Sequence, residues 1–172
     1  MRLPIYLYLF LASSFSSCAQ HSIPEVLEKF NHNTVDYISA DSLRKMEPPV
    51  LLDARERGEF EVSHLKNSVW VGYETFEIDR VLETFPDKDV PIVVYCSLGV
   101  RSEDIGEKLK KAGFTNVKNL YGGIFEWKNK GYPVYDLNQK ETEKVHAYST
   151  YWGNFLINAE KVYTHKTGDT PE

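Results

Sequence analysis

The residues best suited to catalysis are one cysteine and one arginine in the stretch PIVVYCSLGVRS, residues 91–102. Cys96 follows a short apolar run at residues 92–95, and four residues separate it from Arg101. A thiol becomes a nucleophile when its thiolate is stabilised, and a nearby guanidinium or the N-terminus of a following helix stabilises such an anion. The spacing therefore predicts that the pKa of Cys96 is below that of a free thiol, so that Cys96 is nucleophilic at neutral pH.

The loop between the cysteine and the arginine is suited to holding an anion. Backbone N–H groups in a strand-to-helix loop point toward a common centre, and Gly99 fits a position where a side chain would clash or φ must be positive. We expect the substrate-binding loop to consist of Ser97, Leu98, Gly99, Val100 and Ser102. The competing interpretation is that Cys96 is a small buried hydrophobe at a strand end. The fixed register of Gly99 and Arg101 favours the reactive thiol.

The chain around this loop alternates apolar strand patterns with helical stripes. Strands are expected at residues 34–39, 50–54, 68–71, 92–95 and 116–121. Helices are expected at residues 22–33, 41–46, 75–85 and 102–112, with two short ones that carry Phe60 with Leu65 and Phe125 with Trp127. This alternation predicts an α/β fold whose mostly parallel sheet has helices on both faces. Sites in such sheets lie beyond the carboxyl ends of the strands, so Asp53 and Arg55 should share one rim with Cys96 and Arg101.

The composition suits one globular domain with short appendages. The 172 residues are 42% hydrophobic, which is enough to fill a single core. The formal net charge of −5 and the lack of a basic cluster argue against a nucleic-acid partner, because phosphate binding needs a basic face. The two cysteines, Cys18 and Cys96, have separate explanations, so no disulfide framework is expected. No metal ion and no cofactor is expected.

The start of the chain has the pattern of a bacterial export signal. A positive residue precedes an apolar run at residues 3–12, which is too short to span a bilayer, and small residues lead to Cys18. The stretch FSSC resembles the lipobox of bacterial lipoproteins, with Phe15 in place of the usual aliphatic residue. We expect residues 1–17 to be removed and Cys18 to become a lipidated N-terminus; an uncleaved anchor is the alternative. Because Ala19 follows, the resemblance favours attachment to the outer membrane, facing the periplasm.

Three motifs, in order, resemble those of the rhodanese-like sulfurtransferases. The active-site loop matches as C-x-x-G-x-R-S after an IVVYC strand. The stretches LLDARERGEFEVSHLKNS, residues 51–68, and YGGIFEWKNKGYPV, residues 121–134, are similar to the first and the closing signature of the family. The match runs in register over residues 34–134. The matching positions outside the loop are Asp53, Arg55, Glu59, Phe60, His64, Gly122, Gly123, Trp127, Gly131 and Pro133.

The resemblance implies a three-layer rhodanese-like fold with a five-stranded, mainly parallel sheet, and an enzyme similar to thiosulfate sulfurtransferase. Cys96 would take a sulfane sulfur from a small donor molecule and pass it, as a persulfide held by the loop N–H groups, to a thiol or another thiophilic acceptor. Arg101 would orient an anionic donor and help to hold the loop. Asp53 and Arg55 would support the site as a rim ion pair that fixes strand to loop, and His64 as a turn-stabilising residue rather than a proton shuttle.

Departures from the family pattern concern the donor and one turn. Ser97 stands where many thiosulfate-using members have an arginine. The mouth of the site therefore carries less positive charge, which weakens the expectation that thiosulfate is the physiological donor. Ser63 and Asn67 stand where the family usually has glycine. Asn67 is an acceptable replacement because asparagine tolerates the left-handed region, whereas Ser63 affects only a local turn.

Two rival functions are compatible with a reactive cysteine. Cysteine-dependent phosphatases also use a loop that ends in arginine, but that loop is one residue longer than the one between Cys96 and Arg101. The shorter loop suits a single sulfur atom in preference to a tetrahedral phosphate. The second rival is a non-enzymatic module that carries sulfur or binds a partner. The presence of both Cys96 and Arg101 favours the enzyme.

The family resemblance ends near Leu137, which divides the chain. The segments are a signal peptide (1–17), a leading segment (18–33), a rhodanese-like domain (34–137) and a C-terminal extension (138–172). Apolar residues at three- and four-residue steps predict an amphipathic helix over residues 140–163, weakened by Gly153 by roughly 1 kcal/mol. We expect this helix to pack back on the domain; the alternative is a face for a partner or a membrane, and burial of Trp152 distinguishes the two. The sequence does not indicate an oligomeric state.

Overall fold

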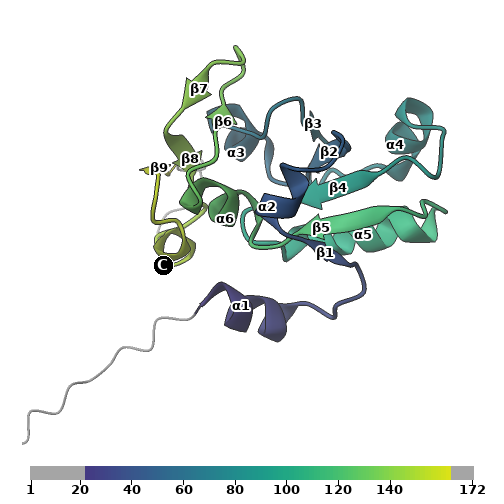
Figure 1. Ribbon diagram of the computed structural model, residues 1–172, viewed down its shortest axis with the longest axis horizontal. Helices are drawn as coiled ribbons and strands as arrows, with labels where there is room; N and C mark the ends of the chain where they lie inside the picture. Colours follow the sequence, from purple (N-terminus) through teal and green to yellow (C-terminus); the bar gives the residue numbers. More distant parts are fainter. Residues whose placement is uncertain (1–21, 164–172) are drawn as a thin grey trace, which may run out of the picture.

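The computed structural model describes residues 22–163, so the predicted signal segment and Cys18 lie outside the described residues. The strands of its main sheet are β1 (Tyr37–Ile38), β2 (Val50–Asp53), β3 (Val69–Trp70), β4 (Ile92–Tyr95) and β5 (Val117–Leu120). They are all parallel and lie in the order β1-β5-β4-β2-β3 (Figure 1). The central strand β4 is buried along its whole length, as expected for a β-branched run without polar alternation.

Helices cover both faces of this sheet. They are α1 (Ile23–Phe30), α2 (Ala40–Leu43), α3 (Arg57–Val62), α4 (Ile78–Thr84), α5 (Arg101–Lys111) and α6 (Gly123–Asn129). Side chains alternate across a strand, so Ile92 and Val94 of β4 pack with α4 and α5 in one apolar cluster. Val93 and Tyr95 pack with α2 and α6 in the other. The predicted three-layer α/β fold with a five-stranded parallel sheet is confirmed.

The predicted elements form, but several are shorter than their sequence patterns. Strand β1 covers only Tyr37–Ile38, because it is an edge strand that pairs with β5 over two residues. Helix α3 ends at Val62, so Leu65 reaches the core from the following turn, where it is fully buried. Asn67 has a φ of 60°, which confirms that this position needs a residue that tolerates the left-handed region.

The amphipathic helix predicted over residues 140–163 is wrong. This part of the chain forms β7 (Glu141–Thr142), β8 (Lys144–His146), a 3-10 helix η1 (Trp152–Phe155) and β9 (Glu160–Val162). Strand β7 pairs antiparallel with β6 (Val134–Tyr135), and β8 pairs parallel with β9. Tyr148 has a φ of 64°, which interrupts any continuous helix. The apolar residues reach the core from β8, from η1 and from the residues that follow each of them, and their spacing resembles that of a helix.

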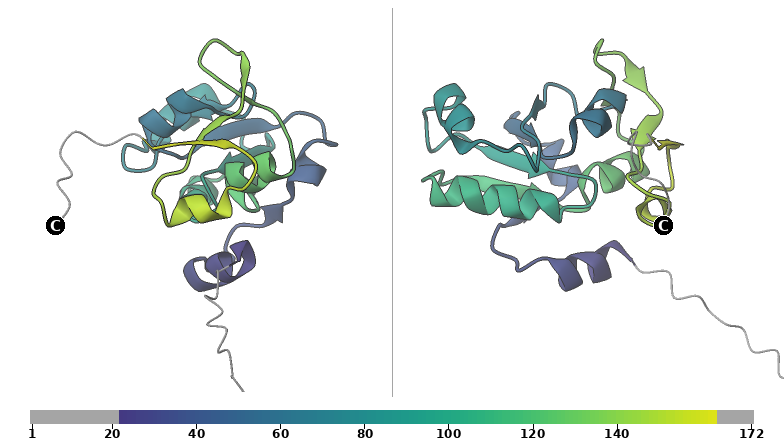
Figure 2. Two further views of the ribbon diagram at one scale, coloured as in Figure 1. Left: turned by 90° about the vertical axis from the view of Figure 1, so that its left-hand side faces the viewer. Right: turned by 180° about the vertical axis from the view of Figure 1, so that it is seen from behind.

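The extension nevertheless packs back on the domain, as expected. Val145 and Leu156 are fully buried, Phe155 is 8% exposed, and all three join the cluster that contains α6. Trp152 is partly buried against the same cluster. Figures 1 and 2 show β8, η1 and β9 beside α3 and α6 at one end of the sheet.

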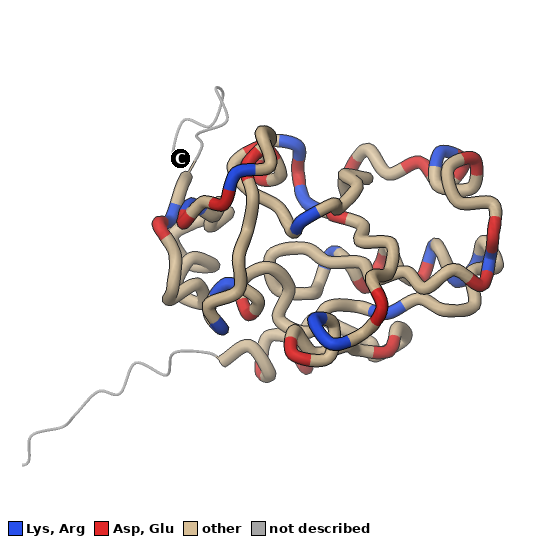
Figure 3. The backbone as a smooth tube through the Cα atoms, turned by 45° about the horizontal axis from the view of Figure 1, so that its top comes forward, with Lys and Arg blue, Asp and Glu red and all other residues tan. Residues whose placement is uncertain are grey.

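The charged residues of the described chain form no basic tract. Figure 3 shows lysine and arginine positions interspersed with aspartate and glutamate along the tube. Within residues 22–163, no helix combines the length and the apolar character needed to cross a bilayer. No group of three or more His, Cys, Asp or Glu side chains in this part of the chain is arranged to hold a metal ion.

Candidate active site

Strand β4 delivers Cys96 into a loop that closes around its sulfur. Cys96 Sγ accepts hydrogen bonds from the Gly99 N–H (3.1 Å) and from the Ser102 hydroxyl (3.5 Å). Gly99 has a φ of 111°, which residues with side chains rarely adopt, so the predicted need for glycine is met. Cys96 is 2% exposed and lines a pocket, so its sulfur is reached only from that side.

The environment of Cys96 favours the thiolate. Burial by itself would raise the pKa of the thiol. The charge of Arg101 opposes this effect, and hydrogen bonds from Ser102 and from the Gly99 N–H add to the opposition, so the pKa of Cys96 lies below its ordinary value. The direction agrees with the one predicted from the sequence, and Arg101 is the largest of the causes that lower the pKa.

Two buried asparagines hold the loop in this shape. Asn119 of β5 donates from Nδ2 to the Gly99 carbonyl (2.8 Å), and its Oδ1 lies 2.7 Å from the Ser102 hydroxyl, whose one proton is shared between this oxygen and Cys96 Sγ. Asn31, just after α1, donates to the same carbonyl (2.9 Å). Neither asparagine was predicted from the sequence, because nothing local connects it to a loop that lies far away in the chain.

The start of α6 supports the other side of the loop. The Ile124 N–H donates to the Cys96 carbonyl (2.9 Å) and the Phe125 N–H to the Ser97 carbonyl (3.1 Å). A side chain on Gly123 would overlap the Cys96 carbonyl, so this approach requires glycine. This explains why α6 begins with a glycine.

Arg101 is paired with a carboxylate. Its guanidinium donates to both carboxylate oxygens of Glu59, at 2.7 and 2.9 Å, and to the Ser97 hydroxyl at 3.0 Å. The Ser97 hydroxyl donates in turn to Glu59 Oε1 (2.9 Å). Burial would raise the pKa of Glu59, but the hydrogen bonds and charge of Arg101 lower it to about 2. Glu59 is therefore ionised at neutral pH and compensates the charge of Arg101.

Glu59 was matched to a family motif from the sequence, but no role was assigned to it. A guanidinium expected beside a buried thiol needs an acidic partner, so the sequence could have indicated that Arg101 pairs with a carboxylate. Glu103 and Asp104 stand much nearer in the chain, yet Glu103 accepts the N–H groups of residues 32 and 34, and Asp104 accepts the Tyr73 hydroxyl. Only the packing of α3 beside the loop selects Glu59.

Asp53 and Arg55 form a second ion pair. Arg55 Nη2 lies 2.6 Å from Asp53 Oδ2, and both side chains are 0% exposed. The ion pair has its predicted place at the carboxyl ends of the strands, since Asp53 ends β2 beside Tyr95 of β4, but it is enclosed rather than exposed because the turn after β2 folds the guanidinium inward. Arg55 Nη2 also donates to the Ser63 carbonyl (2.7 Å). The pair thus connects the end of β2 to the end of α3, the helix that carries Glu59.

His64 supports the same region without lining the pocket. Its Nδ1 lies 3.1 Å from the Phe60 carbonyl oxygen and its Nε2 lies 3.2 Å from the Gln139 amide nitrogen. The carbonyl can only accept, which assigns the proton to Nδ1 and leaves Nε2 to accept from Gln139. The ring also stacks on Phe60, with centroids 4.2 Å apart. These contacts fit a residue that stabilises the turn after α3.

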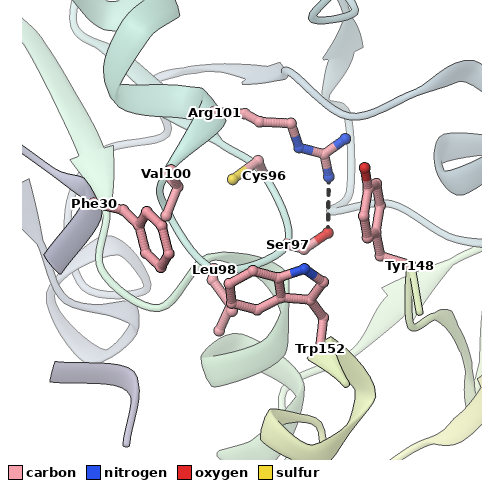
Figure 4. A pocket seen from close by; sticks show the side chains of 8 residues that line it. All are labelled: Phe30, Cys96, Ser97, Leu98, Val100, Arg101, Tyr148 and Trp152. Atoms are coloured by element: carbon pink, nitrogen blue, oxygen red, sulfur yellow. Dashed lines mark hydrogen bonds between the residues drawn. The ribbon is translucent and has the colours of Figure 1, made fainter. Parts of the chain in front are cut away.

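A pocket of about 180 Å³ opens above Cys96. Its lining consists of Phe30, Cys96, Ser97, Leu98, Val100, Arg101, Tyr148 and Trp152 (Figure 4). The three aromatic members were missed from the sequence. Phe30 ends α1, and Tyr148 and Trp152 belong to the extension. The aromatic residues gathered at positions 148–155 were a signal for the last two, whereas no feature of the sequence indicated Phe30.

Comparison with known proteins relates these features to a family. The family model described as rhodanese-like domain matches residues 39–130. The tRNA uridine(34) hydroxylase of Photorhabdus laumondii is 36% identical over 111 residues, which are 59% of this chain and 32% of that protein. An adenylyltransferase and sulfurtransferase of Candida albicans is 31% identical over 115 residues, 64% of this chain and 26% of that protein. The solution structure of the rhodanese-like domain of an Anabaena sp. protein is 24% identical, with a TM-score of 0.53, over 59% of this chain and 79% of that one.

The three layers and the loop that encloses a cysteine at the end of β4 define a rhodanese-like α/β domain. Since the family match covers more than half of the residues, the chain belongs to the rhodanese-like sulfurtransferase family. It spans at most about a third of the length of the two curated relatives. Their names describe the whole of those longer proteins, so we do not extend the hydroxylase or adenylyltransferase activity to this chain.

Proposed function

We propose that the protein is a sulfurtransferase that moves a sulfane sulfur from a small donor, through a Cys96 persulfide, to a thiophilic acceptor. The observation that carries this proposal is the environment of Sγ, which receives hydrogen bonds from Gly99 and Ser102 and lies near the charge of Arg101. A thiolate stabilised in this way is nucleophilic at neutral pH. Membership of the rhodanese-like family supports the same chemistry.

The reaction has two halves, and neither needs an external oxidant or reductant. In the first, the Cys96 thiolate attacks the sulfane sulfur of the donor; a bond from Sγ to that sulfur forms, and the bond to the rest of the donor breaks with its electron pair. In the second, the acceptor attacks the outer sulfur of the persulfide, and the electron pair of the broken S–S bond returns to Sγ. The loop N–H groups stabilise the negative sulfur in both halves.

Arg101 acts in this scheme through the thiolate and the loop. Its contacts with Glu59 and Ser97 tie the loop to α3, and its charge lowers the pKa of Cys96. An anionic donor would have to share this guanidinium with Glu59. The structure therefore supports the loop-holding role of Arg101 more directly than the role of orienting an anionic donor.

The two rivals have less support. A phosphatase loop must hold a tetrahedral phosphate, and four residues between Cys96 and Arg101 form a smaller loop. A non-enzymatic sulfur carrier would form the same persulfide on Cys96 and would differ only in turnover. Turnover is therefore the measurement that separates the carrier from the enzyme.

The test follows sulfur from donor to acceptor. Purified protein given thiosulfate, polysulfide or mercaptopyruvate should gain one sulfur atom on Cys96 by mass spectrometry, and with cyanide it should release thiocyanate repeatedly. Cys96→Ser should abolish both signals, since it removes the nucleophile with little change of volume. Loading without repeated release would identify a carrier. Absence of loading from all three donors would contradict sulfur transfer.

We also propose that the protein is exported and attached to the bacterial outer membrane, facing the periplasm, by a lipid on Cys18. The sequence pattern of residues 1–18 supports this proposal, and these residues lie outside the described part of the chain. Expression in a bacterial host should yield protein that begins at Cys18 and carries acyl chains, as measured by mass spectrometry. Cys18→Ser should yield protein without acyl chains, and a mature chain that retains residues 1–17 would contradict the proposal.

A further inference from the structure

The mouth of the pocket above Cys96 is built partly by segments outside the family match at residues 39–130. Phe30 comes from α1, and Tyr148 and Trp152 come from the extension. The rings of Phe30 and Trp152 meet edge to face, with centroids 6.1 Å apart. Tyr148 is held in a defined turn, with a φ of 64° and its N–H donating to His146 Nδ1 (3.1 Å). The chemistry of the mouth is therefore a property of this chain rather than of the shared domain.

The surroundings of the sulfur are mostly apolar. Leu98 and Val100 line the pocket together with the three rings. Figure 4 shows the Cys96 sulfur on the side of Phe30 and Val100, whereas the Arg101 guanidinium lies on the other side, toward Tyr148. An apolar cavity of about 150 Å³ is known to accommodate benzene. A space of about 180 Å³ therefore has room for an apolar group of that size.

The pocket offers little to a doubly charged donor. Arg101 is the one cationic side chain among the described residues that line it, and both oxygens of Glu59 already accept from its guanidinium, at 2.7 and 2.9 Å. The Tyr148 ring also covers the guanidinium, with 5.1 Å between the ring centroid and the Arg101 Cζ. An entering dianion would lose hydration without gaining an unpaired cation. An uncharged group would instead gain apolar contacts.

We propose that this pocket selects an organic persulfide, R–S–SH, whose R group is uncharged and apolar or aromatic and packs among Phe30, Tyr148 and Trp152. The inference rests on the proposed sulfur transfer at Cys96. In the loading step the Cys96 thiolate attacks the outer sulfur, and a new bond from Sγ to that sulfur forms. The S–S bond of the donor breaks, its electron pair leaves on R–S⁻, and the proton of the outer sulfur stays on the transferred atom. Water then protonates R–S⁻, and no oxidant or reductant is consumed.

The test compares two persulfides that differ in R. Phenylmethyl persulfide has an aromatic, uncharged R group, and 2-sulfonatoethyl persulfide has a small anionic one, while their leaving thiolates are of similar basicity. Each is mixed with the protein at equal concentration, with thiosulfate as a third donor, and the gain of one sulfur on Cys96 is followed by rapid quenching and mass spectrometry. The phenylmethyl donor is expected to load Cys96 about tenfold faster than the sulfonated one.

Substitutions of the aromatic residues test whether they cause the faster loading from phenylmethyl persulfide. Trp152→Ala should reduce the ratio of the two loading rates about tenfold and Phe30→Ala several-fold, whereas Trp152→Phe should retain most of it. A general change in the reactivity of Cys96 affects both loading rates equally, so it does not change their ratio. Ile157→Ala is the matched control, because Ile157 belongs to the same extension, is 78% exposed and does not line the pocket, so its ratio should equal that of the wild type.

A binding measurement keeps the inference independent of turnover. Phenylmethyl methyl sulfide, which has no sulfur to transfer, should change the tryptophan fluorescence of Cys96→Ser, and this change should disappear when Trp152→Phe is added. Equal loading from both persulfides, or a ratio that neither Trp152→Ala nor Phe30→Ala alters, would overturn the inference while sulfur transfer stands. Absence of loading from both persulfides would overturn the inference, and sulfur transfer itself would fall only if thiosulfate, polysulfide and mercaptopyruvate also failed to load Cys96.

Discussion

Two arginine–carboxylate pairs of this molecule are alike in chemistry and differ in their surroundings. Arg55 and Asp53 are close in the chain and 0% exposed, and they connect β2 to the end of α3. Arg101 and Glu59 are 42 positions apart, and the Arg101 side chain is 17% exposed at a pocket. A pair enclosed on all sides acts on folding, whereas a pair that reaches a cavity beside a thiol also acts on reactivity. Substitutions in the two pairs should separate these roles.

The largest effect is expected for Arg55→Met, which leaves the Asp53 carboxylate buried without its cation. Breaking a buried ion pair costs about 3–5 kcal/mol, and the free energy of unfolding should fall by that amount in denaturant titration. The matched control is Arg57→Met, because Arg57 pairs with Glu61 on the surface and its side chain is 55% exposed. The control should change stability by less than about 0.5 kcal/mol. Similar small losses in both variants would contradict a structural role for the buried pair.

The dependence of stability on pH should report the Glu59 pair. The folded-state pKa of Glu59 is about 2, below its ordinary value of 4.5, so the unfolded chain binds this proton first as the pH falls. The stabilisation is therefore complete above about pH 4.5 and is lost toward about pH 2; the difference corresponds to about 3 kcal/mol. Unfolding free energies measured over this range should fall less steeply in Glu59→Gln than in the wild type. If the unfolding free energies of Glu59→Gln and the wild type fell in parallel with pH, a lowered pKa of Glu59 in the folded state would be contradicted.

A smaller effect, on reactivity, is expected for Arg101→Met. The substitution removes the charge that opposes the effect of burial, so the pKa of Cys96 should rise. Less thiolate at neutral pH should slow sulfur loading about tenfold, and the pH profile of Cys96 alkylation measures the pKa directly. Arg101→Lys keeps the positive charge but loses the planar guanidinium that donates to both oxygens of Glu59. Its loading rate and its Cys96 pKa should therefore lie between those of the wild type and of Arg101→Met. An unchanged alkylation profile in Arg101→Met would show that the charge does not act on the thiol.

The smallest effect is expected for Tyr148→Leu. A cation–π contact at an exposed site contributes about 0.5–1 kcal/mol, and Tyr148 is 52% exposed, so the free energy of unfolding should change by less than about 1 kcal/mol. Removal of the ring uncovers the Arg101 guanidinium. Loading from thiosulfate should therefore rise relative to loading from phenylmethyl persulfide. A fall in this ratio would show that the ring does not shield the guanidinium.

Local features of the site were predictable because adjacent residues encode them. The apolar run of β4 and the positive φ of Gly99 follow from the stretch around Cys96, and the lowered pKa of its thiol follows from that stretch and the fixed charge of Arg101. The depth of the Asp53–Arg55 pair was not predictable, because burial depends on how α3 and the strands enclose the turn after β2. The helix expected at residues 140–163 failed for a related reason. A period of three to four residues shows only which side chains reach the core, and a short strand followed by a 3-10 turn can place side chains in the core at the same spacing.

The sequence by itself determined the parallel α/β fold, the strand that ends at Cys96 and the four-residue spacing to Arg101, since hydrophobic periodicity, glycine and residue spacing act over short stretches of chain. The tertiary structure decided that Glu59 pairs with Arg101 and that Phe30 and Trp152 meet over the sulfur. These residues lie far apart in the chain, and no short-range preference selects one carboxylate or one ring over another. Packing of α1, α3 and the extension around the loop makes that selection, because only then do their side chains come within contact distance.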